Sequence, residues 1–142
     1  MVWQDFNQKV FRFAVLKHVR ETDIHWDLLL QLPLRPLLAT WQIRRNPAQW
    51  EHELQPIPAL AIPDHRLIYL DFQGEISGGR GHVTRIDGGK VEISRADENV
   101  MEFCLHGQVL RGHWHLTHDS NPDPAVSQHW HLRFNKPKNL IS

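Results

Sequence analysis

The stretch "FRFAVLKHVRETDIHWDLLLQL", residues 11 to 32, contains two apolar runs separated by a short polar segment. The runs at 11–16 and 25–32 have the length of β-strands, and the segment between them is short enough to form a turn. A short connection joins two neighbouring strands most simply as an antiparallel hairpin. We therefore predict that the chain begins with such a pair.

Further short apolar runs follow, each bounded by turn residues. They predict strands or helical turns at 37–43, 58–63, 64–72, 99–107, 108–118 and 128–134. The segment 46–54 predicts a short helix, with Asn46 as N-cap and Pro47 at its first position. The tripeptide at 87–89, Asp-Gly-Gly between alternating residues, indicates a hairpin turn. The predicted fold is mainly β: a single small antiparallel β-barrel with one or two short helices, forming one domain over residues 1–142.

The composition restricts the class of protein. The chain of 142 residues has 16 acidic and 16 basic residues, and this balance argues against a protein that coats polyanions through its overall charge. Cys104 is the only cysteine, so an intramolecular disulfide is excluded and a reducing compartment is expected. Without a signal-peptide core or a run long enough to span a bilayer, we expect a cytoplasmic protein with no membrane partner. Histidine is unusually frequent, with eleven copies.

Two of these histidines lie in the polar part of the opening stretch. Alternate side chains share one face of a strand, so His25 and Asp27 point the same way. If the two strands pair, His18 folds back toward His25. Two imidazoles and one carboxylate suit manganese, zinc or iron(II) rather than calcium. On spacing alone, a polar hairpin end with solvated histidines explains the same residues, because short His/Asp motifs are common by chance.

Three segments, taken in order, resemble the 3′-phosphoesterase domain of bacterial DNA ligase D. They are "HVRETDIHWDLLL", "DHRLIYLDFQGEISGGRG" and "FCLHGQVLRGHWHL". Their shared features are a histidine followed by a His-any-Asp triplet, an Asp-His pair with a tyrosine four residues after the histidine, a glycine-rich hairpin, and a Phe-any-Leu-any-Gly…Leu-any-Gly-any-Trp strand pair. Each piece is weak alone, but their common order over residues 11–134 is fairly specific.

The resemblance implies a hydrolase of DNA repair, a Mn²⁺-dependent phosphoesterase that trims phosphates and ribonucleosides from nucleic-acid 3′ ends. By position, His18, His25 and Asp27 would hold Mn²⁺ or Zn²⁺. His65 would contact the scissile phosphate, and Tyr69 would support it. A nucleic-acid 3′ end or another phosphate ester would be the substrate, and other DNA repair proteins are the expected partners.

The sequence also departs from the family pattern. Leu29 stands where the family has an arginine, the arginine expected before the Asp-His pair is missing, and the loop after His18 is one residue longer. The resemblance also implies an N-terminal extension with further functional residues, which we expect to be missing here. Without these arginines, the site lacks guanidinium groups that could each bind a phosphate through two hydrogen bonds. Arg80 in the glycine-rich hairpin is the predicted replacement, and Arg20, Arg66 and Arg85 are weaker candidates.

Three functions stay open on this basis: a metal-dependent phosphoesterase, a non-catalytic module that binds nucleic-acid ends or phosphate, and a cupin-like iron(II) oxygenase. The oxygenase would need a distal histidine such as His82 or His106. The two His-Trp-His triplets at 113–115 and 129–131 could in principle cluster four imidazoles. The favoured interpretation is that their tryptophans face the core and their histidines face water. For Cys104, the expectation is a buried, inert thiol.

Overall fold

The computed structural model describes residues 10–120, 123 and 128–136, which form nine strands and two short 3₁₀-helices. Residues 1–9, 121–122, 124–127 and 137–142 lie outside this description. In chain order the elements are β1 Phe11–Arg20, β2 Asp23–Leu30, β3 Leu38–Ile43, η1 Pro47–His52, β4 Ile57–His65, η2 Leu67–Leu70, β5 Gly74–Glu75, β6 His82–Ala96, β7 Val100–His106, β8 Arg111–His118 and β9 His129–Asn135.

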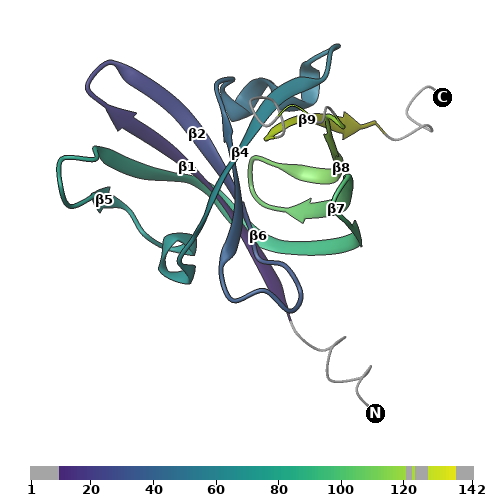
Figure 1. Cartoon of the computed structure of the whole chain (residues 1–142), viewed down its shortest axis with the longest axis horizontal. Coiled ribbons are helices and arrows are strands. Elements are labelled where there is room, and N and C mark those ends of the chain that lie inside the picture. The colour runs from purple at the N-terminus through teal and green to yellow at the C-terminus, as the bar shows by residue number, and fades with distance from the viewer. Residues whose placement is uncertain (1–9, 121–122, 124–127, 137–142) are drawn as a thin grey trace.

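All the strand pairs are antiparallel, and they close into a ring. The order is β1-β2-β3-β4-β9-β8-β7-β6, and β6 pairs back with β1, while the short β5 is added beside the start of β6. Figure 1 shows this curled sheet, with β5 on the same side of the molecule as the turn between β1 and β2. The predicted mainly β, barrel-like fold is confirmed.

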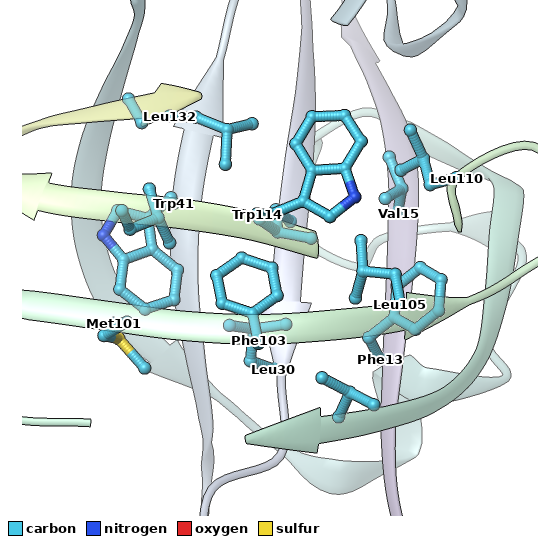
Figure 2. Packing of buried hydrophobic residues seen from close by; sticks show 14 of the residues in the cluster. Phe13, Val15, Leu30, Trp41, Met101, Phe103, Leu105, Leu110, Trp114 and Leu132 are labelled. Carbon is cyan, nitrogen blue, oxygen red and sulfur yellow. The ribbon is translucent and has the colours of Figure 1, made fainter. Parts of the chain in front are cut away.

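The inside of the ring holds the main hydrophobic core. Phe13 and Val15 of β1 face inward together with Leu28 and Leu30 of β2, so the alternation predicted for the opening stretch is observed. Figure 2 shows the indole rings of Trp41 and Trp114 packed in this interior around Phe103. Burial of such large side chains contributes roughly 1.5–3 kcal/mol each.

The intervening residues of β1 and β2 face the outside, where a second apolar cluster forms. It comprises Ala14, Leu16, Leu29, Leu38, Leu70 and Val83, and the segment that carries η2 covers it. Two arginines fix this segment to the barrel. Arg12 of β1 donates to both carboxylate oxygens of Asp71, at 3.1 and 2.5 Å, and Arg85 of β6 donates to the Leu70 carbonyl at 2.7 Å. The chain from 64 to 81 is thereby held against the outer face of β1.

The helix predicted at 46–54 is present in shortened form as η1. Asn46 is its N-cap and accepts a hydrogen bond from the Ala48 backbone N–H at 3.0 Å, with Pro47 at the first position. Trp50 anchors this turn, because its ring is buried and its indole N–H donates to the Arg45 carbonyl at 2.8 Å.

The hairpin predicted at Asp87-Gly88-Gly89 is wrong, because β6 continues through all three residues. The two glycines are required by close packing inside the strand. A Cβ on Gly88 would overlap the Arg85 guanidinium, and one on Gly89 would overlap the His106 carbonyl. The register between β1 and β6 shifts at this place, which marks a β-bulge rather than a chain reversal.

The two His-Trp-His triplets follow the favoured interpretation in part. Trp114 is buried, whereas His113 and His129 are exposed; Trp130 is only partly buried. The register of β8 and β9 places His115 opposite Arg133 rather than opposite another histidine. The four imidazoles therefore do not form a common cluster across these strands.

Candidate metal centre

The pairing of β1 with β2 brings the two predicted histidine ligands together. His18 and His25 are direct cross-strand partners, and their ring centroids are 4.8 Å apart. Asp27 is two residues along the same face, with one carboxylate oxygen 3.3 Å from His25 Nε2 and the other 3.9 Å from His18 Nδ1. Ligand atoms from all three side chains lie within 4.8 Å of one another. A single ion could therefore contact all three.

Each imidazole is oriented by a contact through its other ring nitrogen. His18 Nε2 lies 2.7 Å from the Arg80 carbonyl, and because a carbonyl only accepts, this nitrogen carries the proton. His25 Nδ1 lies 3.2 Å from a carboxylate oxygen of Asp23 in a hydrogen bond, whereas the Asp27 oxygen beside Nε2 has no aligned hydrogen-bond partner in the described structure, so the geometry favours the proton of the neutral ring on Nδ1. The lone pairs of His18 Nδ1 and His25 Nε2 are left facing Asp27. This arrangement of outer hydrogen bonds is typical of metal-binding histidines.

Asp27 supplies the observation that fits a cation. Its side chain is only 3% exposed, and its Oδ1 has no well-aligned hydrogen-bond partner among the described residues, although His25 Nε2 is nearby. A buried carboxylate oxygen without a donor is costly to keep in a folded protein. Burial alone would lower the pKa of His25, but Asp27 and Asp23 raise it above its ordinary value, because both carboxylates favour the charged ring. The group thus attracts positive charge.

A pocket of about 350 Å³ opens beside this group. His18 and Asp27 line it together with the other predicted site residues, which are His65, Tyr69 and Arg80. His65 and Tyr69 pack edge to face with ring centroids 5.5 Å apart, and His65 Nδ1 lies 3.0 Å from the Pro63 carbonyl. The Nδ1–H of His65 therefore points to its own backbone, which leaves Nε2 for a ligand.

The glycine-rich turn closes one side of the pocket. The backbone N–H of Ile76 donates to the Gly81 carbonyl at 2.8 Å, and Gly81 has a φ of 98°. A Cβ at Gly81 would overlap the Val19 carbonyl, so only glycine lets this turn approach β1 so closely. That approach is what carries the Arg80 carbonyl to His18. The glycine-rich turn thus helps to orient His18, a candidate metal ligand, through a backbone carbonyl.

The residues between 16 and 118 match the family described as the DNA Ligase D 3'-phosphoesterase domain. This match covers most of the chain. The chain belongs to this family.

A curated relative is the multifunctional non-homologous end joining protein LigD of Pseudomonas aeruginosa. It is 29% identical to this chain over an alignment that covers 75% of the chain and 13% of the relative. This member of the DNA ligase D phosphoesterase family therefore corresponds to a small part of that protein.

The departures from the family pattern now have a structural setting. Leu29, at the place of a family arginine, is completely buried in the outer apolar cluster beneath η2. Arg80 and Arg66 line the pocket. The Arg80 guanidinium donates to Ser77, and that of Arg66 lies 5.9 Å from the Tyr69 ring centre. Arg85 donates a hydrogen bond to the Leu70 carbonyl, and this contact gives it a structural role.

A second group of metal-competent side chains lies on the outer face of β6 and β7. Glu92, Cys104 and His106 have ligand atoms within 4.8 Å of one another. Here the carboxylate already pairs with His106 at 2.6 Å, and burial together with Glu92 raises the pKa of the Cys104 thiol. Cys104 is half-exposed rather than buried as predicted. The oxygenase hypothesis loses support, because neither His82 nor His106 joins His25 and Asp27 in the described part of the chain.

Sequence reasoning missed two residues beside the metal group. Asp23 contacts His25, and Arg44, just after β3, donates to Asp23 at 2.7 Å. Asp23 lies inside the quoted segment that starts at His18 but was given no role, and Arg44 lies outside all the quoted motifs. The register of β2 and β3 brings the two residues together. In the described ranges, no helix has both the length and the apolar character needed to cross a bilayer.

Proposed function

We propose that this chain is a metal-dependent phosphoesterase that removes phosphate or a ribonucleotide from nucleic-acid 3′ ends during DNA repair. The main support for this proposal is that His18, Asp27 and His65 line the same pocket. A group that attracts a cation therefore lies beside a histidine that could contact a phosphate. Family membership supports the same reaction class. DNA ends are the proposed substrate, and other end-joining proteins are the proposed partners.

The ion would be held by His18 Nδ1, His25 Nε2 and the Asp27 carboxylate. A ligand set of two imidazole nitrogens and one carboxylate suits Mn²⁺ or Zn²⁺. The bound ion would neutralise phosphate charge and lower the pKa of water. Manganese is the ion we propose first, since the family resemblance implies it.

The remaining chemistry falls to the residues of the pocket wall. Hydrolysis forms a bond between a water oxygen and phosphorus and breaks the bond between phosphorus and the 3′ oxygen. The departing 3′ oxygen then needs a proton. In its protonated form, His65 can supply that proton from Nε2 while its Nδ1–H stays on the Pro63 carbonyl. Tyr69 packs against the His65 ring and limits its rotation. Arg80 and Arg66 line the pocket and would bind phosphate oxygens after leaving their present contacts with Ser77 and the Tyr69 ring.

His65→Ala tests this assignment. We expect the variant to lose at least about 100-fold in the rate of phosphate release from a 3′-phosphorylated oligonucleotide, the range typical of a lost general acid. Mn²⁺ binding should stay within about twofold of the parent, because His65 is not in the ligand group. His52→Ala, at the exposed end of η1, is the matched control and should retain the parental rate. Equal rates for both variants would remove His65 from the mechanism.

The burial of Leu29 favours one alternative, a non-catalytic module that binds phosphorylated ends. The guanidinium that the family places there is replaced by an apolar side chain that cannot contact phosphate. The same assay decides between the two functions. A parent protein that binds Mn²⁺ and the 3′-phosphorylated oligonucleotide but releases no phosphate would favour the binding module.

A further inference from the structure

Asp23 and Arg44 form a hydrogen-bonded chain that ends on one of the candidate metal ligands. Arg44 donates to one oxygen of Asp23 at 2.7 Å, and the other oxygen of Asp23 lies 3.2 Å from His25 Nδ1. On the far side of the same ring, His25 Nε2 is 3.3 Å from Asp27. The imidazole is therefore held between two carboxylates, one from the pocket and one from the surface.

We propose that Asp23, supported by Arg44, is a positioning residue that holds His25 in the tautomer and orientation needed to bind the metal. This inference rests on the proposed metal-dependent function and assigns a role that the family motifs do not cover. Asp23 does not itself contact the ion.

The argument begins with the two tautomers of neutral histidine. A metal takes a lone pair, so His25 can bind through Nε2 only when the ring proton is on Nδ1. A carboxylate cannot donate, and Asp23 therefore favours the proton on Nδ1. Without Asp23, Asp27 would be the remaining carboxylate beside the ring, 3.3 Å from Nε2, so part of the population would carry the proton on Nε2 and meet the ion with an N–H. The ring would also be free to rotate about its χ angles.

Asp23 needs a second anchor because its side chain is 48% exposed, and an exposed carboxylate rarely keeps one orientation. The sheet provides that anchor. Trp26 pairs with Ile43 in the register of β2 and β3, which brings Arg44, the next residue, to the end of β2 that begins with Asp23. Arg44 donates to one oxygen of Asp23 at 2.7 Å and leaves the other oxygen to accept from His25.

A neighbouring ion pair shows what an ordinary surface contact looks like in this protein. Arg45 donates to Glu53 at 2.9 Å, again between an arginine after β3 and an acidic side chain that is partly exposed. This pair touches none of the three candidate ligands. The Asp23–Arg44 pair differs in one respect, because its carboxylate also reaches His25. The two pairs therefore make a matched comparison.

The test measures the His25 tautomer and the metal affinity separately. In the metal-free protein, ¹⁵N shifts of the histidine rings should report the Nδ1–H form in the parent and a mixture in Asp23→Ala. For Mn²⁺ binding, we expect Asp23→Ala to raise the Kd about 10- to 100-fold, the range found for other outer-shell partners of metal ligands. Arg44→Met should give a smaller loss, and Glu53→Ala should give none.

Asp23→Asn serves as the rescue, because its amide oxygen can still accept from Nδ1. It should keep the tautomer of the parent and recover part of the affinity lost in Asp23→Ala. An unchanged tautomer and Kd in Asp23→Ala would overturn the inference while leaving the metal site intact. A parent that binds no Mn²⁺ at millimolar concentration would instead overturn the proposed function, and the ring shifts would still decide whether Asp23 sets the tautomer.

Discussion

Replacing Asp27 with alanine is expected to abolish the stabilisation of this protein by Mn²⁺. Asp27 is the only carboxylate in the ligand group, and its two oxygens face His25 and His18. A ligand at 100 times its Kd stabilises the folded state by about 2.7 kcal/mol. In thermal denaturation with Mn²⁺ at this concentration, we expect the Tm of the parent to rise by an amount that corresponds to this free energy. The Tm of Asp27→Ala should not change when Mn²⁺ is added.

Removing the charge of Asp27 should cost little stability in the metal-free protein. One oxygen of Asp27 is buried without a well-aligned donor in the described structure, so the parent already bears the desolvation penalty of this carboxylate. Asp27→Asn keeps the volume and removes the charge. We therefore expect its metal-free Tm to equal or exceed that of the parent, in the way that functional groups often reduce stability.

Asp64→Ala is the matched control for both measurements. Asp64 lines the same pocket, but its carboxylate pairs with Arg35 at 3.0 Å and lies outside the ligand group. Its variant should keep the full Mn²⁺ shift. If Asp27→Ala were stabilised by Mn²⁺ as strongly as Asp64→Ala, the ion would have to bind elsewhere, with Glu92, Cys104 and His106 as the next group to test.

The ligand group could be predicted from the sequence because its geometry depends on local rules. The alternation of side chains in a strand places His25 and Asp27 on one face, and a hairpin returns the chain toward His18. The position of His65 does not follow from such rules. It depends on Arg12 and Arg85 fixing a segment some fifty residues away onto β1, and only the order of motifs shared with the family indicated it.

The missed features share a different cause, since they depend on the register and packing between strands and not on the alternation of side chains within one strand. Asp23 and Arg44 meet only because of the register of β2 against β3. Asp87-Gly88-Gly89 has the composition of a turn, but in the structure Gly88 and Gly89 make room for neighbouring groups inside a long strand. Turn propensity is a local property, and here the packing of β6 between β1 and β7 overrides it.

Asp87, the residue of β6 just before Gly88 and Gly89, should be among the most important residues for stability. It is 5% exposed and accepts hydrogen bonds from three successive backbone N–H groups in the turn between β7 and β8, those of Gln108, Val109 and Leu110, at 2.9, 3.1 and 2.7 Å. Gly107 leaves the space, because a Cβ there would overlap the Asp87 carboxylate.

Asp87→Ala leaves these three donors without their acceptor, and the N–H of buried Leu110 has least access to water. Each unsatisfied buried donor costs about 1–3 kcal/mol, so we expect the free energy of unfolding to fall by about 3 kcal/mol in urea denaturation. Asp97→Ala is the comparison, since Asp97 caps the preceding turn by accepting from Asn99 and Val100 at an exposed position. Its loss should cost clearly less than the loss of Asp87, because water replaces an exposed acceptor. Equal costs for the two variants would mean that burial does not set the strength of the Asp87 cap. A folded Asp87→Ala protein should still bind Mn²⁺ with parental affinity, because Asp87 belongs to the scaffold and not to the ligand group.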